Sequence, residues 1–334
     1  MSSEQDGPRV AIVGAGVIGL GIGWQLASRG ISVEIFERDR PGSGASRAAA
    51  GMLAPSSELD FEEDALLRFG LRSLEMFPEF VAELEEASGR DVDYRTDGTL
   101  VVAVDRDDAE AIEHVHSYRR ELDLEAERLT AEQARQLEPG LAPRIHGAVH
   151  CHSDHQVDPN RLIDALVDAF EAAGGLLHTD TPVDAVDLEQ RPHRLIVEDG
   201  ESFEADLVVL AAGAWSTEIE GIPDGVLPHI RPVRGQMLSV DLGDPPLCEH
   251  VIRVPDPSQL DVYLVPKSDG RLLVGATSEE RGFDPHLTVG GVFELLRGAY
   301  KALPGIYDHD ILEMWTGFRP VTLANEPVLG PTDV

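Results

Sequence analysis

Residues 9–39 read RVAIVGAGVIGLGIGWQLASRGISVEIFERD, with a glycine-rich turn between an apolar strand and a helix. The glycines of its GxGxxG pattern are Gly14, Gly16 and Gly19. In such a turn the first glycine permits a tight bend, the second lets the backbone approach a pyrophosphate, and the third lets the helix pack on the strand. The stretch therefore predicts a strand–helix–strand unit that binds a dinucleotide at the helix N-terminus.

The residues that follow narrow the choice of dinucleotide. Glu37 comes directly after the second predicted strand, 31–36. A carboxylate about 20 residues after the glycines accepts a hydrogen bond from a ribose 2′-hydroxyl and repels a 2′-phosphate, which argues against NADP. Residues 45–55, ASRAAAGMLAP, are mostly small, as expected where backbone lies against a large flat cofactor. This pattern favours FAD over NAD. The alternative is that 45–55 is an alanine-rich helix without a role in cofactor binding.

Composition limits the classes of function. A chain of 334 residues suggests about two domains, and 42% hydrophobic with 26% charged residues is typical of a globular protein. Acidic residues outnumber basic ones 61 to 27, for a net charge of −34, so the surface repels nucleic-acid backbones. Such a surface is tolerated best in concentrated salt, where the Debye length falls to about 3 Å. We therefore predict a cytoplasmic protein of a halophile that does not bind nucleic acid.

Three further features carry no function in this interpretation. Residues 10–28 lack charge but contain five glycines and follow no basic leader, so we predict no membrane span. Cys151 and Cys248 lie far apart and form no CxxC motif, which indicates no disulfide framework. His150 and His152 share one face of a predicted strand, yet nothing fixes a ligand geometry around them, and we predict no metal site.

The predicted fold class is α/β, with an FAD-binding Rossmann-like domain interwoven with a β-rich α+β substrate domain. An apolar strand predicted over 207–212 returns the chain to the first sheet. Pro78 is expected to break or kink the helix predicted over 62–88. The predicted FAD-binding domain comprises residues 1–90, 153–227 and 315–334, and the substrate-binding domain comprises 91–152 and 228–314.

Several motifs occur in order along nearly the whole chain. After the glycine motif come GASRAAAGMLAP, VDPNRL, VVLAAGAWS, RPVRGQML, YLVPKSDGRLLVGAT and GFRP, at 44–55, 157–162, 208–216, 231–238, 263–277 and 317–320. Together they resemble the glycine oxidases of thiamine biosynthesis, in the FAD-dependent D-amino acid oxidase superfamily. Members of that family continue after the segment matching PVLGP, 327–331, with a strand and a GHxRNG turn. The chain ends at Val334, so we expect it to lack this segment.

The resemblance implies a non-covalent FAD site, because Ala48 stands where flavin-tethering relatives carry histidine. The residues it places around the cofactor are Gly14, Gly16, Val17, Ile18, Gly19, Glu37, Arg38, Ala45, Ser46, Ala50, Gly51, Met52, Val183 and Gly213.

The resemblance also implies three catalytic residues, Arg319, Tyr263 and Met52. Arg319 would hold the substrate carboxylate, for which its planar fork is suited; Tyr263 would add a second donor, and Met52 would border the flavin. The implied reaction is FAD-dependent oxidation of glycine or a similar small amino acid to the imine. Oxygen would be reduced to hydrogen peroxide, and the product would feed thiazole synthesis for thiamine.

Two other classes of function stay open at this stage. The same scaffold suits a D-amino acid oxidase or a sarcosine-type oxidase or dehydrogenase. A non-catalytic, flavin-free interaction protein is the second alternative, because the expected C-terminal segment would close the cofactor site. A homo-oligomer is compatible with either class.

Overall fold

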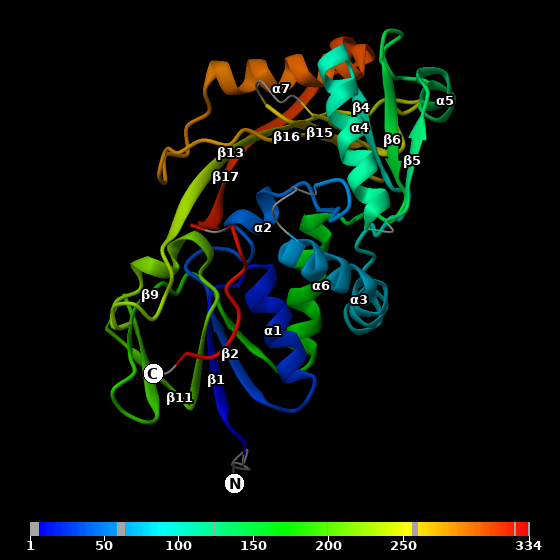
Figure 1. Ribbon diagram of the computed structural model, residues 1–334. Coiled ribbons are helices and arrows are strands. Elements are labelled where there is room, and N and C mark those ends of the chain that lie inside the picture. Colours follow the sequence, from blue (N-terminus) through cyan, green and yellow to red (C-terminus); the bar gives the residue numbers. More distant parts are fainter. Residues whose placement is uncertain are drawn as a thin grey trace.

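The computed structural model describes residues 7–58, 64–122, 124–198, 200–255, 260–323 and 325–332. A parallel sheet with helices forms one end of the molecule, and a large, mostly antiparallel sheet forms the other (Figure 1). Two long strands, β13 (Ile230–Asp241) and β17 (Ile311–Thr322), extend from the large sheet toward the parallel one (Figure 1). The α/β fold class predicted from the glycine motif is confirmed.

The parallel sheet has four strands, and its first strand lies inside it. β1 pairs with its neighbour β12 from Val10–Leu207 to Val13–Leu210, and with β2 on its other edge. The apolar run of β1 is buried, as expected for a parallel strand covered on both faces. In spatial order the strands are β12 (Leu207–Leu210), β1 (Arg9–Val13), β2 (Ser32–Phe36) and β8 (Leu176–His178).

Helices cover one face of this sheet and a small antiparallel sheet covers the other. Ile12, Trp24 and Phe170 belong to the buried core on the helical side, where α1 and α6 lie side by side (Figure 1). Val13 and Phe36 belong to a second core on the opposite side. The helices are α1 (Val17–Ala27), α3 (Asp64–Ser88) and α6 (Pro159–Ala172), and the small sheet consists of β11 (Ser202–Ala205), β10 (His193–Val197) and β9 (Val183–Asp187).

The helix α3 continues through Pro78, so of the break or kink predicted there the break is wrong. Leu74 lies before the proline, and Val81 and Leu84 lie after it; all three are buried. A proline removes one backbone hydrogen bond and clashes with the preceding turn. Burial of apolar side chains on both sides of Pro78 keeps the two halves of the helix in one element.

The large sheet has eight strands, with helices on both of its faces. Leu295 and Ala299 of α7 pack with Leu264 and Val274 of the sheet, whereas Ile112 of α4 packs against another part of it. In spatial order the strands are β17, β13, β16 (Arg271–Gly275), β15 (Val262–Pro266), β14 (Val251–Val254), β4 (Thr99–Ala103), β6 (Gly147–Cys151) and β5 (Ala126–Leu129). The helices are α4 (Arg106–Glu121), α5 (Ala131–Leu137) and α7 (Val289–Ala302).

The remaining elements of the described residues are short. They are α2 (Ala45–Ala48), β3 (Met52–Leu53) paired with β7 (His155–Gln156), and the 3₁₀ helices η1 (Gly213–Glu218) and η2 (Pro304–Asp308).

The division into two domains stays a proposal, and strand pairing bears on its last boundary, at residue 315. Residues 315–334 were placed with the FAD-binding domain, yet 315–322 belong to β17 and pair along β13 in the large sheet. The reason is length: the β13–β17 pair continues past the edge of the other strands toward the parallel sheet. Strand pairing therefore favours assigning 315–322 to the substrate domain.

Candidate functional site

The glycine loop follows β1 and leaves no room for larger residues at two of its positions. Gly14 has φ +103°, and a Cβ added there would lie 2.6 Å from the Ala211 carbonyl oxygen. A Cβ at Gly19 would lie 1.9 Å from the Gly14 carbonyl oxygen. The first glycine is therefore fixed by the neighbouring strand end, and the third by close packing of α1 on the turn.

The N-terminus of α1 has no capping side chain of its own. Gly16 provides no side-chain cap, and the first turn contains no acidic residue although the chain has 61 of them. The Val17 N–H donates to the Ser46 hydroxyl at 2.9 Å, and the Ile18 side chain is exposed. An uncompensated helix N-terminus with nearby N–H and O–H groups suits a pyrophosphate.

Glu37 connects the glycine loop to the end of β2. Its carboxylate is buried and accepts from the Ala15 N–H at 2.8 Å and from the Asp39 N–H at 3.1 Å. The Thr181 N–H donates to the Glu37 carbonyl at 2.8 Å, which brings the buried Val183 to this edge of the sheet. A carboxylate has about four acceptor sites, so Glu37 can also accept a ribose hydroxyl.

Arg38 follows β2 and Gly213 follows β12, the two strands that flank β1 in the parallel sheet. The Arg38 guanidinium stacks 3.7 Å above the centre of the Trp215 ring, a cation–π contact. Trp215 in turn stacks on Phe283, with ring centres 4.9 Å apart. Gly213 has φ +57°, and nothing lies within 4 Å of a Cβ built on it, so space remains open there.

The small residues after α2 bring backbone against the large sheet. Ala45 and Ser46 lie in α2, and Ala50 is buried in a core formed with the large sheet, which Met52 also contacts. Gly51 has φ +78°, and a Cβ there would lie 1.9 Å from the Val157 carbonyl oxygen. The small side chains therefore permit close approach of two backbone segments, and the role predicted for them against the cofactor stays a prediction.

Tyr263 and Arg319 meet on the same side of the large sheet as Met52. Met52 and Tyr263 pack against one buried cluster. Burial raises the pKa of Tyr263, and the Arg319 guanidinium is close enough to oppose that rise. The Arg319 Nη1 donates to the Thr277 carbonyl oxygen at 3.1 Å. The three predicted catalytic residues thus lie near one another, although they come from distant parts of the chain.

Two glycines make this arrangement sterically feasible, and the sequence analysis assigned neither of them a role. A Cβ at Gly275 would lie 2.5 Å from Cε2 of the Tyr263 ring, and one at Gly235 would lie 3.0 Å from Nη1 of Arg319. Gly235 lies inside β13 and Gly275 ends β16, and a glycine in a strand often marks a close approach by another group. That signal could have identified them.

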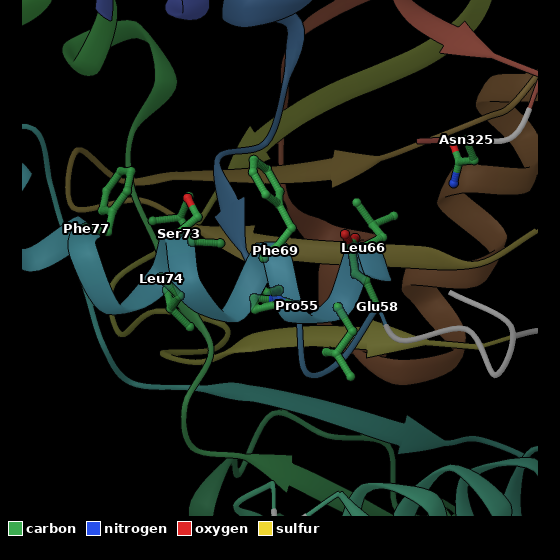
Figure 2. Close-up of a pocket in the computed structure, with 12 residues that line it drawn as sticks. Pro55, Glu58, Leu66, Phe69, Ser73, Leu74, Phe77 and Asn325 are labelled. Atoms are coloured by element: carbon green, nitrogen blue, oxygen red, sulfur yellow. The ribbon is translucent and has the colours of Figure 1, made fainter. Parts of the chain in front are cut away.

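A pocket of about 410 Å³ lies between α3 and the segment that follows Met52. Figure 2 shows its mainly apolar wall, with Glu58 as the charged member. Glu58 also acts electrostatically on Tyr263, so the pocket is close to the catalytic candidates. The lining residues are Leu53, Ala54, Pro55, Glu58, Leu66, Leu67, Phe69, Gly70, Ser73, Leu74, Phe77 and Asn325.

The histidine pair lies away from these residues. The rings of His150 and His152 have centres 3.9 Å apart. Burial lowers the pKa of His150, with smaller contributions from His152 and His250. In the part of the chain that the structure describes, no three His, Cys, Asp or Glu side chains gather in a metal-binding group.

Comparison with known families identifies the family of this chain. The model of the family described as FAD dependent oxidoreductase (DAO) matches residues 9–334. The chain belongs to this family. As an FAD dependent oxidoreductase, it has the α/β fold and the cofactor that the glycine motif predicted, and the resemblance found in the sequence is confirmed.

Three relatives illustrate the similarity of this FAD dependent oxidoreductase. It is 36% identical over 322 residues to a glycine oxidase of Geobacillus kaustophilus, covering 96% of this chain and 83% of the relative. The crystal structure of glycine oxidase from that organism superposes with a TM-score of 0.89 at 35% identity, covering 97% of this chain and 86% of that one. A bifunctional protein ThiO/ThiG of Trichormus variabilis is 33% identical, covering 96% of this chain and 47% of the relative.

A membrane-spanning helix is not found among the helices of the described residues, since none combines sufficient length with sufficient hydropathy.

Proposed function

We propose that this protein is an FAD-dependent amino acid oxidase that converts glycine or a similarly small amino acid to the imine, with oxygen reduced to hydrogen peroxide. The observation that carries this proposal is the meeting of Arg319 and Tyr263 beside Met52. The names of the relatives, glycine oxidase and ThiO/ThiG, support the substrate class. The product would feed thiazole synthesis for thiamine.

The cofactor site fits FAD because the chain offers an uncapped helix N-terminus, a glycine loop without side chains and the carboxylate of Glu37. Gly16, Val17 and Ser46 would hold the pyrophosphate, and Glu37 a ribose hydroxyl. When bound, FAD supplies a two-electron acceptor that passes its electrons to oxygen. Ala48 offers no nucleophile to the flavin, so we propose that the cofactor is held without a covalent bond.

The chain's own residues orient the substrate. The fork of Arg319 would grip the carboxylate with two parallel charge-assisted bonds, and the Tyr263 hydroxyl would donate a third. This grip would fix the direction of the Cα–H bond relative to the ring that Met52 borders. The hydride leaves a neutral amine, so no residue has to remove a proton from carbon. The net charge of −34 leads us to propose a cytoplasmic location in a halophile.

The experiment starts from the visible absorbance of the purified chain. We expect a flavin band and, after acid precipitation, yellow colour in the supernatant. Glycine, sarcosine and small D-amino acids are then compared, with peroxide formation and reduction of an artificial electron acceptor followed separately. Lack of a flavin band after incubation with FAD would contradict the proposal and favour the flavin-free alternative. Preference for sarcosine or a D-amino acid, or turnover with the artificial acceptor alone, would favour the oxidase or dehydrogenase alternatives.

A further inference from the structure

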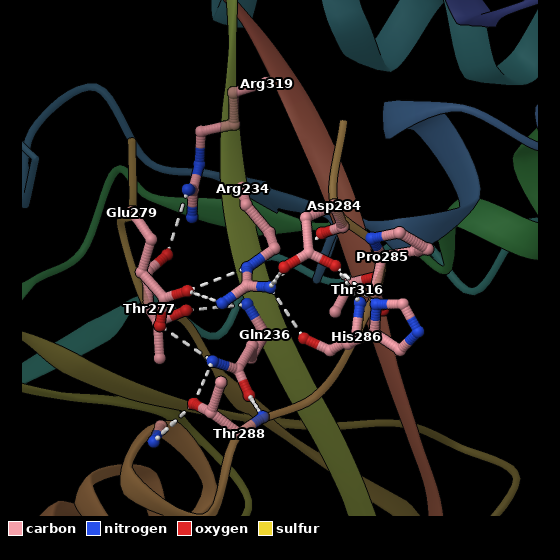
Figure 3. A network of polar contacts seen from close by, with 11 residues as sticks. Arg234, Gln236, Thr277, Glu279, Asp284, Pro285, His286, Thr288, Thr316 and Arg319 are labelled. Carbon is pink, nitrogen blue, oxygen red and sulfur yellow. Dashed lines mark hydrogen bonds and ion pairs between the residues drawn. The ribbon is translucent and has the colours of Figure 1, made fainter. Parts of the chain in front are cut away.

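The Arg319 side chain crosses the face of β13 to reach the segment that contains Thr277. β17 and β13 are paired, with Arg319 opposite Val233, and Thr277 lies on the other side of β13. Gly235 has no side chain, so the guanidinium lies directly over the strand on its way to the Thr277 carbonyl (Figure 3). A guanidinium has five N–H donors, so this bond leaves donors for a carboxylate. The position of Thr277 therefore sets the direction of the fork.

Thr277 is itself held by Gln236 of β13. The Gln236 N–H donates to the Thr277 hydroxyl at 2.8 Å, and the Thr277 N–H donates to the Gln236 carbonyl at 3.2 Å. The Gln236 side chain is buried and bonds to Glu279 at 2.7 Å and to the Thr288 hydroxyl at 2.9 Å. Residues 277–279 thus continue alongside β13 beyond the end of β16.

An ion pair between Arg234 and Glu279 holds this segment two residues after Thr277. Arg234 is fully buried, and its Nε donates to Glu279 Oε2 at 2.7 Å, with a second, shorter contact from Nη2 (Figure 3). The two backbones also exchange hydrogen bonds of 3.0 and 2.9 Å. Nη1 of Arg234 reaches the His286 carbonyl at 2.7 Å and both the carbonyl and the carboxylate of Asp284 at 3.2 Å. One guanidinium therefore fixes both ends of the loop 279–286.

Strand geometry places this ion pair on the face opposite the substrate site. Successive side chains of a strand point to opposite faces, so Arg234 and Gln236 lie opposite Gly235 and Met237. Met237 belongs to the cluster that contains Tyr263. Arg234 can therefore act on a substrate only indirectly, and the backbone of residues 277–279 links its side chain to Arg319.

We propose that Arg234 and Glu279 are a positioning pair for substrate binding: their ion pair holds residues 277–279 so that the Thr277 carbonyl aims the Arg319 guanidinium at the substrate carboxylate. The inference rests on the proposed function of Arg319. It assigns a role in carboxylate affinity to two residues that do not touch the substrate.

The test compares Glu279→Gln with Glu280→Gln in the full chain loaded with FAD. Both variants remove one carboxylate from the same loop, but Glu280 is exposed and pairs with Arg231 at the surface. Because small misplacements of a binding group have large effects, Glu279→Gln should raise KM for glycine about fivefold or more, with kcat within about twofold. The dissociation constant of acetate, read from the flavin absorbance without turnover, should rise in parallel. Glu280→Gln should match the wild type in both.

A second pair of variants keeps the ion pair and loosens only Thr277. Thr277→Val removes the hydroxyl that Gln236 bonds, whereas Thr277→Ser retains it. We expect a larger rise in the acetate dissociation constant for valine than for serine. This pair decides the question if Glu279→Gln fails to fold.

The outcomes separate this inference from the proposed function. If Arg319→Ala weakens acetate binding but Glu279→Gln and Thr277→Val bind acetate as the wild type does, the positioning role is wrong and the function stands. A loss of thermal stability with unchanged acetate affinity likewise overturns it. If Arg319→Ala itself leaves acetate binding and KM unchanged, the carboxylate assignment fails and this inference fails with it.

Discussion

At the scale of single residues, Arg319 and Tyr263 are predicted to contribute unequally. A charge-assisted bidentate contact is about twice as strong as a neutral hydrogen bond. Arg319→Ala should therefore raise KM for glycine by at least about 10-fold, or about 1.4 kcal/mol, with the flavin spectrum intact. Tyr263→Phe should raise it about fivefold at most, because the neutral hydrogen bond that it removes contributes about 1 kcal/mol. Steady-state kinetics on both variants measures this, and an unchanged KM in Arg319→Ala would show that another group holds the carboxylate.

Lys267 gives a pH-dependent prediction at the same scale. It is buried, donates to the Val157 carbonyl at 2.9 Å, and burial lowers its pKa to about 8. An unfolded lysine titrates near 10.4, so between these values the unfolded chain binds more protons. The contribution of Lys267 to stability therefore rises as pH increases from about 8 toward 10.4, and is lost as pH falls through 8.

The matching variant is Lys267→Met, which does not titrate. From pH 7.5 to pH 10 the wild type should gain about 2 kcal/mol of unfolding free energy relative to this variant. Denaturant unfolding of both proteins at the two pH values measures the difference. Parallel pH profiles of the two proteins would mean that Lys267 keeps its ordinary pKa.

At the scale of elements, alanine substitutions at two of the glycines of α1 are predicted to change stability in opposite directions. A Cβ at Gly19 would lie 1.9 Å from the Gly14 carbonyl, whereas nothing lies within 4 Å of one at Gly21. Gly19→Ala should destabilise the protein by roughly 1–3 kcal/mol and weaken FAD binding. Gly21→Ala should stabilise it by roughly 0.5–1 kcal/mol through helix propensity. Denaturant midpoints and FAD titrations measure both effects, and equal behaviour of the two variants would contradict the packing argument.

The elements also differ in how far the sequence predicts them. β1 spans Arg9–Val13 as predicted, because its apolar run is short, buried and bounded by the glycine turn. The helix α3 was expected to be broken or kinked at Pro78 and is not broken, because packing of its apolar face outweighs the loss of one backbone hydrogen bond. β17 is long and pairs along the whole of β13, which local sequence patterns do not reveal because pairing partners are distant.

At the scale of the whole molecule, the net charge of −34 predicts salt-dependent stability. Self-repulsion of the acidic surface falls as the Debye length shortens from about 10 Å at 0.1 M to about 3 Å at 1 M salt. The thermal midpoint should therefore rise steeply between 0.1 and about 2 M KCl. Sucrose at matched osmolality is the control, because it stabilises by exclusion without screening charge. If KCl raises the midpoint no more than sucrose does, repulsion is not limiting the stability of this protein.

The sequence by itself determined the cofactor half of this protein. The glycine turn, Glu37 and the small residues at 45–55 are short stretches, and the residue types in each follow from backbone sterics or charge. Steric exclusion of a Cβ acts over a few ångströms within one loop. The need for glycine at such a position is therefore visible from the residue type alone. The family resemblance then supplied the candidates Arg319 and Tyr263.

Only the tertiary structure decided how the substrate half is assembled. The crossing of Arg319 over Gly235, the ion pair of Arg234 and Glu279, and the burial of Lys267 each depend on strands that are distant in the sequence. Pairing register sets which side chains share a face, and one residue of slip would exchange the faces. Register is fixed by the packing of the whole sheet, so it cannot be predicted from the sequence of a single strand.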